Sequence, residues 1–247
     1  MSRPRAAAAT VAAGVFAVLA ALVAHGDLTS IDQWAVGHAM PGADFSGTST
    51  FASALIPLWD VHWHGALHVI AELVIVPASF TPATVIVAPA CLRLRGRAGM
   101  TLAAAYAAGN AIELLVKATL TRPPLYAHGV HLASFDSSYP SGHTIRTVLV
   151  AFAVAWAWPR LARWAIPWAV CSLVLIELGG QHVPSDIVGG LLVAAALLLT
   201  TWSSCSRRPS TASRPSARAR RGAPRARRSR GRAAEARRAG PSSRSSC

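Results

Sequence analysis

Two histidines with polar neighbours are the residues of this chain best suited to chemistry. The first, His143, lies in the segment 139–146 (YPSGHTIR), directly before the apolar run 147–158. Pro140 and Ser141 predict the start of a helix there, because proline is tolerated in a first helical turn and a serine oxygen can cap free backbone N–H groups.

The start of this predicted helix has the groups needed to bind a phosphate. The backbone amides of Ser141 and Gly142 would point outward from the helix N-terminus, and Gly142 has no side chain to block an approaching anion. His143 and Arg146 are three residues apart, so both can reach the same bound group. The structural alternative is a capped helix with an interfacial histidine and a snorkelling arginine.

The second histidine, His182, lies in the segment 181–190 (QHVPSDIVGG), which again precedes an apolar run. Asp186 is four residues away, a spacing at which its carboxylate can hold one ring nitrogen and leave the other free. A pair of this kind makes a nucleophilic or basic imidazole. Upstream, Lys117 and Arg122 place two cations at the end of another apolar run.

Together these segments resemble the type-2 phosphatidic-acid phosphatase superfamily, a family of membrane and soluble histidine phosphatases. Its signature has three parts: a Lys followed by Arg-Pro, a Pro-Ser-Gly-His, and a Ser-Arg followed by His-x-x-x-Asp. The second part matches fully at residues 140–143, and the third matches in His182 and Asp186. The order and the spacing of the parts also suit the family.

Two arginines of the signature are missing from their usual positions. Arg122 follows Lys117 after four residues, where the family usually has six, and Leu175 and Ile176 stand where Ser-Arg is usual. In the family, both missing residues bind phosphate. We expect Arg122 to serve for the first arginine, and Arg146 to replace the second.

Glu113 offers a structural role for Lys117, since the two residues are four apart in the order that favours a salt bridge. Phosphate binding is our preferred prediction for Lys117, because it ends its apolar run next to Arg122. The two roles are compatible if Glu113 orients the lysine.

The resemblance implies hydrolysis of a phosphate ester through a phosphohistidine. His182 would attack phosphorus, oriented by Asp186, while His143 would protonate the leaving group. The groups that would hold the non-bridging oxygens are Lys117, Arg122, Arg146 and the amides of Ser141 and Gly142. With cations and amides in these places, the reaction needs no metal ion and no other cofactor.

The composition excludes an ordinary soluble fold. Hydrophobic residues make up 53% of the 247 residues, and charged residues only 14%. We predict an all-α membrane bundle of six transmembrane helices. The predicted spans are residues 6–24, 67–92, 100–120, 141–158, 164–178 and 187–202.

The first apolar run could also be a signal peptide, because a basic start fits both interpretations. We prefer a retained helix, since further spans follow and the sequence after Ala24 is a poor cleavage site. Prolines at 77, 82 and 89 predict kinks or a re-entrant start in the second span.

The net charge of +14 comes from the C-terminal end of the chain. Fourteen of the 24 basic residues follow Ser206, where the only acid is Glu235. We predict a transmembrane domain at 1–202 and a disordered Arg-rich cytoplasmic tail at 203–247, which would be drawn to anionic membrane lipids. A solvated extension without function is the alternative, and nucleic-acid binding is not expected because no aromatic residue is interleaved for stacking.

The arginines also predict the orientation in a cell membrane. Arginines in 1–5, 93–97, 160–163 and the tail alternate along a six-span path, so all four groups can be cytoplasmic. Both termini would then be cytoplasmic. The three motif segments would share the extracytoplasmic face, beside a loop at about 25–64 that would carry short amphipathic helices.

We predict no metal site, and neutral imidazoles beside interfacial tryptophans are the preferred interpretation of the histidines near residue 64. His62, His64 and His68 lie close together in the sequence, but no carboxylate or cysteine completes an obvious ligand set. The four cysteines also lack metal or disulfide spacing. They are Cys91, Cys171, Cys205 and Cys247.

A site at the outer face of a bundle embedded in lipid favours a lipid phosphate as substrate. Phosphatidate, phosphatidylglycerol phosphate and a polyprenyl diphosphate suit the sequence equally, and it predicts no oligomeric state. A phosphotransferase would use the same residues with an alcohol in place of water. The two missing arginines also motivate a family member that binds lipid headgroups without turnover.

Overall fold

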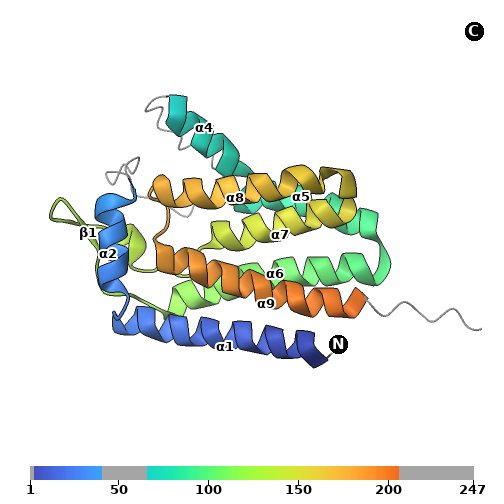
Figure 1. Ribbon diagram of the computed structural model, residues 1–247, viewed down its shortest axis with the longest axis horizontal. Helices are drawn as coiled ribbons and strands as arrows, with labels where there is room; N and C mark the ends of the chain where they lie inside the picture. The colour runs from blue at the N-terminus through green and yellow to red at the C-terminus, as the bar shows by residue number, and fades with distance from the viewer. Residues whose placement is uncertain (1–2, 41–65, 206–247) are drawn as a thin grey trace, which may run out of the picture. The chain divides into compact units, whose positions relative to one another are not determined.

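The computed structural model describes residues 3–40 and 66–205 (Figure 1). Most of the predicted loop at 25–64, with His62 and His64, and nearly all of the predicted tail at 203–247 lie outside the described residues. The chain divides into two units, Met1–Arg208 and Pro209–Cys247, and the description concerns the first.

The described chain is mostly helical, as predicted. Its helices are α1 (Arg3–His25), α2 (Thr29–His38), α4 (Ala66–Ile75), α5 (Phe80–Leu94), α6 (Gly96–Thr119), α7 (Gly142–Ala157), α8 (Ala162–Leu178) and α9 (Pro184–Cys205). Short 3-10 turns are η2 (Val76–Ala78), η3 (Ala133–Phe135) and η4 (Pro159–Leu161). Between α6 and α7, β1 (Tyr126–Ala127) and β2 (Val130–His131) pair in antiparallel register.

Four of the described helical stretches are long and apolar enough to cross a membrane: α1, α6, α9, and η4 with α8. Helices α5 and α7 are apolar but shorter, with 15 and 16 residues. The predicted second span is divided into α4, η2 and α5. Pro77 lies in η2, where its missing N–H and its ring prevent a continuous helix. Six spans therefore stay a prediction.

Helix α7 is the centre of the bundle, because it packs against α5, α6, α8 and α9. Its side chains in the main apolar core are Ile145, Leu149, Val150, Ala153 and Ala157. Helix α1 packs along α9 at one side, and α4 contacts α8 at the other. The first turn of α7 carries His143, so the most enclosed helix positions one of the two motif histidines.

The arginines at 1–5, 93–97 and 160–163 lie at the end of the bundle opposite the motif segments. In Figure 1 the start of α1, the α5–α6 turn, the α7–α8 turn and the end of α9 lie at one end of the bundle. The opposite end holds α2, the β1–β2 hairpin, the end of α6 and the starts of α7 and α9. All three motif segments therefore reach the same end.

Helix α2 covers this end of the bundle with a buried inner face. Asp32, Ala35 and Val36 of α2 are buried, and the helix contacts α9 and β1. A second apolar cluster joins α2 to the loop before α7 and to Val183. The sequence predicts short amphipathic helices in the loop at about 25–64, and apolar side chains of the hairpin loop provide the partner for the buried face of α2.

Gly109 of α6 allows three helices to approach closely. A Cβ atom at this position would lie 2.9 Å from Ile145 Cγ2, 3.2 Å from Leu149 Cδ1 and 3.3 Å from Leu197 Cδ1. These side chains belong to α7 and α9, so a larger residue at 109 would separate α6 from both helices.

We expect Gly109→Leu to destabilise the protein by about 1–3 kcal/mol, because the added side chain overpacks the helix contact. Thermal unfolding of the purified protein in detergent measures the change. Gly14→Leu in α1 is the matched control, since nothing lies within 4 Å of a Cβ atom at that position. Equal unfolding temperatures for the two variants would contradict the close approach of α6.

Candidate active site

Two imidazoles from distant segments of the chain face each other at the motif end of the bundle. His143 is in the first turn of α7, and His182 is in the turn that precedes α9. Their ring centroids are 5.8 Å apart, and the ring planes make an angle of 56°. His182 is 6% exposed, while His143 is partly exposed. Two groups able to transfer protons or attack phosphorus thus share one space.

Ser141 caps α7, as the sequence predicts. Its Oγ accepts hydrogen bonds from the backbone N–H of Thr144 at 3.1 Å and from Thr144 Oγ1 at 3.0 Å. The backbone N–H of Ser141 donates to the carbonyl of Asp186 at 3.0 Å and thereby ties the starts of α7 and α9 together. This amide, which we predicted to bind phosphate, is therefore engaged in a structural bond.

Asp186 contacts His182 at the predicted four-residue spacing. His182 Nδ1 lies 3.4 Å from Asp186 Oδ2, at the long end of hydrogen-bonding distance. Burial lowers the pKa of His182, whereas the hydrogen bond and charge of Asp186 act to raise it. An imidazole with a lowered pKa is neutral near pH 7, which is the form a nucleophile requires.

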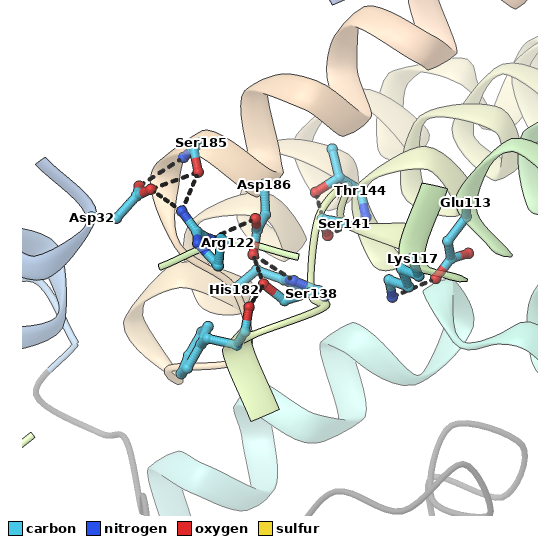
Figure 2. Close-up of polar contacts among 11 residues, drawn as sticks. Asp32, Glu113, Lys117, Arg122, Ser138, Ser141, Thr144, His182, Ser185 and Asp186 are labelled. Carbon is cyan, nitrogen blue, oxygen red and sulfur yellow. Dashed lines mark hydrogen bonds and ion pairs between the residues drawn. The ribbon is translucent and has the colours of Figure 1, made fainter. Parts of the chain in front are cut away.

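Both oxygens of the Asp186 carboxylate have further partners (Figure 2). Ser138 Oγ donates to Oδ2 at 2.6 Å, and Arg122 Nη1 donates to Oδ1 at 3.0 Å. The side chain of Asp186 is 0% exposed, so these bonds replace the water that a carboxylate would otherwise bind. The orientation of the carboxylate toward His182 is therefore strongly constrained.

Arg122, which we predicted to bind phosphate, lies among acidic side chains. Its guanidinium forms ion pairs with Asp32 and Asp186 and donates to Ser185 Oγ at 3.0 Å. Its side chain is only 2% exposed. Burial raises the pKa of Asp32, and the Arg122 charge opposes that rise. Two buried carboxylates without a cation would be costly, which explains why Arg122 lies between them.

Lys117 and Arg146 meet at a third carboxylate, that of Glu113. Lys117 Nζ donates to Glu113 Oε1 at 2.8 Å, and Arg146 Nη1 donates to Glu113 Oε2 at 2.6 Å. The predicted Glu113–Lys117 salt bridge is thus confirmed. Arg146 also donates to Asn110 Oδ1 at 3.0 Å and to the carbonyl of Ala78 at 2.8 Å.

The Glu113 carboxylate lies directly against Gly142. A Cβ atom added to Gly142 would overlap this carboxylate, so only glycine allows the contact. Two of the cations predicted to bind phosphate therefore converge beside the N-terminus of α7, next to His143. The Glu113 carboxylate occupies part of the space beside Gly142.

The position of the missing family arginine is apolar. Ile176 is 0% exposed and packs in a cluster with Ile75 and Ile187. Leu175 is packed against the same cluster. A guanidinium there would be buried without a partner in this cluster, which is costly. Arg146 enters the site from α7 instead.

Sequence reasoning did not identify Asp32, Ser138, Ser185 and Asn110, although all four bond to site residues. Ser138 and Ser185 adjoin the motif segments, so their proximity was a usable signal. Asp32 is 90 residues before Arg122, and nothing in the sequence connects the two. Among the described residues, no group of three or more His, Cys, Asp or Glu side chains could hold a metal ion.

Comparisons with known proteins found a family model and a solved structure that are similar to this chain. Residues 97–209 match the family model described as the PAP2 superfamily. The crystal structure described as the first transmembrane PAP2 type phosphatidylglycerolphosphate phosphatase from Bacillus subtilis is similar, with a TM-score of 0.53 and 17% sequence identity. The match covers 81% of this chain and 98% of that chain. At this identity the likeness shows a shared fold. No curated protein matches the chain.

The matched segment includes every motif position on which the resemblance rests, from Lys117 to Asp186. Outside it, α1 and α2 complete the bundle and cover its motif end. Residues 97–209 are thus similar to the PAP2 superfamily, the type-2 phosphatidic-acid phosphatases that the motifs of this chain resemble.

Proposed function

We propose that this protein is a membrane lipid phosphatase that hydrolyses a lipid phosphomonoester or diphosphate through a phosphohistidine at His182. The observation that carries the proposal is the pair of facing imidazoles, with ring centroids 5.8 Å apart and Asp186 beside His182. The match of residues 97–209 to the PAP2 superfamily model and the membrane-length helices support it.

The first step of the proposed reaction forms the phosphoenzyme. Because Asp186 holds Nδ1, the lone pair of His182 Nε2 attacks phosphorus, and the bond from phosphorus to the leaving oxygen breaks. His143 donates a proton to that oxygen, which departs as a lipid alcohol or as a lipid monophosphate. His143 is then neutral.

The second step releases phosphate. Neutral His143 takes a proton from a water molecule whose oxygen attacks phosphorus, and the bond from phosphorus to Nε2 breaks. His182 returns to its neutral state, and His143 is protonated again for the next cycle. Each histidine therefore returns to its starting protonation state, and atoms and protons balance over one turnover.

The cations beside Gly142 are proposed to stabilise the phosphate oxygens. Lys117 and Arg146 each carry several N–H donors, so they can bind phosphate while they keep or loosen their bonds to Glu113. The partly exposed His143 lies on the same helix turn as Gly142. We assign no phosphate contact to Arg122, because its guanidinium bonds to Asp32 and Asp186.

We further propose that the site is on the extracytoplasmic face, with both termini cytoplasmic. The arginines of the α5–α6 and α7–α8 turns lie at the opposite end of the bundle from the two histidines (Figure 1). Arginine-rich turns favour the cytoplasmic side of a cell membrane.

Three lipid classes remain candidate substrates: phosphatidate, phosphatidylglycerol phosphate and polyprenyl diphosphates. The solved relative is described as a phosphatidylglycerolphosphate phosphatase, which makes that lipid the first to test.

One observation favours a second candidate function, the binding of lipid headgroups without turnover. Glu113 neutralises part of the charge of Lys117 and Arg146, and Arg122 is engaged elsewhere.

We expect phosphate release from at least one of the three lipid classes by the purified protein in detergent. His182→Ala should abolish it, and His143→Ala should lower kcat by about 100-fold to 10,000-fold, because a general acid is lost. His131→Ala is the matched control, since His131 is an exposed histidine of the β1–β2 hairpin. Lipid binding without release by wild-type protein would support the headgroup-binding function instead.

Turnover should persist in EDTA, because the proposed reaction uses cationic side chains and imidazoles in place of a metal ion. The same phosphate-release assay with and without the chelator measures this. Strict dependence on an added divalent cation would contradict the proposed mechanism.

Arg146→Ala should lower kcat/KM by about 10-fold to 100-fold, as the loss of a charge-assisted hydrogen bond to phosphate predicts. The variant also leaves Glu113 without one of its partners, which could reduce stability. The double variant Arg146→Ala with Glu113→Gln removes that unpaired charge and should recover thermal stability but not activity. Arg163→Ala, near the start of α8, is the control, and full turnover by Arg146→Ala would refute the role.

A further inference from the structure

A buried charge cluster lies behind His182 and includes a residue of α2. Asp32 and Asp186 are each 0% exposed, and the Arg122 side chain between them is 2% exposed. Ser185 lies within hydrogen-bonding distance of both Asp32 and Arg122. The two carboxylates of the cluster share one guanidinium, so the loss of one contact changes the hydrogen bonds that remain for the other groups.

The contacts form a continuous path from α2 to the imidazole (Figure 2). Asp32 Oδ2 accepts from Ser185 Oγ at 2.7 Å and from Arg122 Nη2, while Oδ1 accepts from the backbone N–H of Ser185 at 3.2 Å. Arg122 Nη1 then donates to Asp186 Oδ1 at 3.0 Å. The second oxygen of Asp186, Oδ2, is the one near His182 Nδ1.

We propose that Asp32 is a positioning residue for His182, which it orients through Arg122 and Asp186. The proposal rests on the function proposed above, because it assigns Asp32 to the nucleophile of that reaction. Asp32 lies in α2, outside the matched segment 97–209. Arg122, which the sequence analysis assigns to phosphate binding, becomes a positioning residue as well.

The geometry of a guanidinium explains how Asp32 can orient the Asp186 carboxylate through Arg122. Arginine binds a carboxylate most strongly through two parallel N–H donors, one to each oxygen. Asp32 occupies Nη2, so Arg122 presents Nη1 to Oδ1 of Asp186 and leaves Oδ2 for Ser138 and His182. Without the Asp32 charge, Arg122 could bind both oxygens of Asp186 and withdraw Oδ2 from the imidazole.

The two roles for Arg122 differ in their kinetic effects. A phosphate ligand contributes to binding, so its loss weakens inhibition by inorganic phosphate. A positioning residue acts on the orientation of the nucleophile, so its loss lowers kcat and leaves phosphate affinity unchanged. Asp32 has no contact with the imidazoles in the described residues, so its effect can reach His182 only through its neighbours.

The test uses the full chain in detergent, with the lipid phosphate that wild-type protein hydrolyses. For Asp32→Asn, which keeps the side-chain shape, we expect kcat to fall by about 10-fold to 100-fold, with KM and the inhibition constant of inorganic phosphate unchanged within about twofold. Arg122→Ala should show the same pattern. Asp136→Asn, at an exposed carboxylate of the loop before α7, is the control and should retain wild-type kinetics.

Two outcomes would overturn the proposal. One is unchanged kcat in Asp32→Asn, and the other is inhibition by phosphate that weakens by about 10-fold or more in Arg122→Ala, the result for a phosphate ligand. If Asp32→Asn does not fold, Ser185→Ala removes one hydroxyl from the same cluster. It should lower kcat in the same direction with unchanged phosphate inhibition, and unchanged kcat in this variant would also overturn the proposal.

A spectroscopic measurement separates this inference from the proposed function. If wild-type protein releases no phosphate from any lipid, the proposed function fails, and nitrogen-15 NMR of the His182 imidazole then tests the positioning directly. The proton should reside on Nδ1 in wild-type protein and shift partly to Nε2 in Asp32→Asn. Identical spectra for the two proteins would refute the role of Asp32.

Discussion

The structure depends on the pairing of the charges that the described helices enclose at the motif end of the bundle. Asp186 has the most partners: its carboxylate accepts from Arg122 and Ser138 and lies near His182, while its backbone carbonyl accepts from Ser141. One residue therefore orients the proposed nucleophile and also joins the start of α9 to the start of α7. Breaking a buried ion pair of this kind costs about 3–5 kcal/mol, because it leaves a charge without a partner.

The same requirement explains a second cluster on the other side of His143. Glu113 of α6 accepts from Lys117 and from Arg146 of α7, and its carboxylate lies against Gly142. The cluster carries two positive charges and one negative charge, so it keeps a net attraction for an anion while each ion remains satisfied. A phosphate that enters beside Gly142 would compete with a carboxylate already in place.

The fold brings these clusters together through helix starts. Helix α7 is enclosed by four other helices, and its capped N-terminus fixes His143, while the turn before α9 fixes His182. Small residues such as Gly109 let α6 approach α7 and α9, which sets the position of Glu113 and Lys117. Helix α2 then covers this end and contributes Asp32. Segments far apart in the chain supply the two imidazoles and their partners, as a shared active site requires.

The sequence by itself determined the helical class, the cap at Ser141, the His182–Asp186 spacing and the Glu113–Lys117 pair. Each depends on residues within a few positions of one another or on apolar runs, so local rules suffice. Only the tertiary structure decided the partners of Arg122 and Arg146, the apolar surroundings of Ile176 and the entry of Asp32 into the site. An arginine side chain is long enough to reach several anions. Which one it binds depends on which carboxylates the fold buries beside it, and that information lies in helix packing across distant segments.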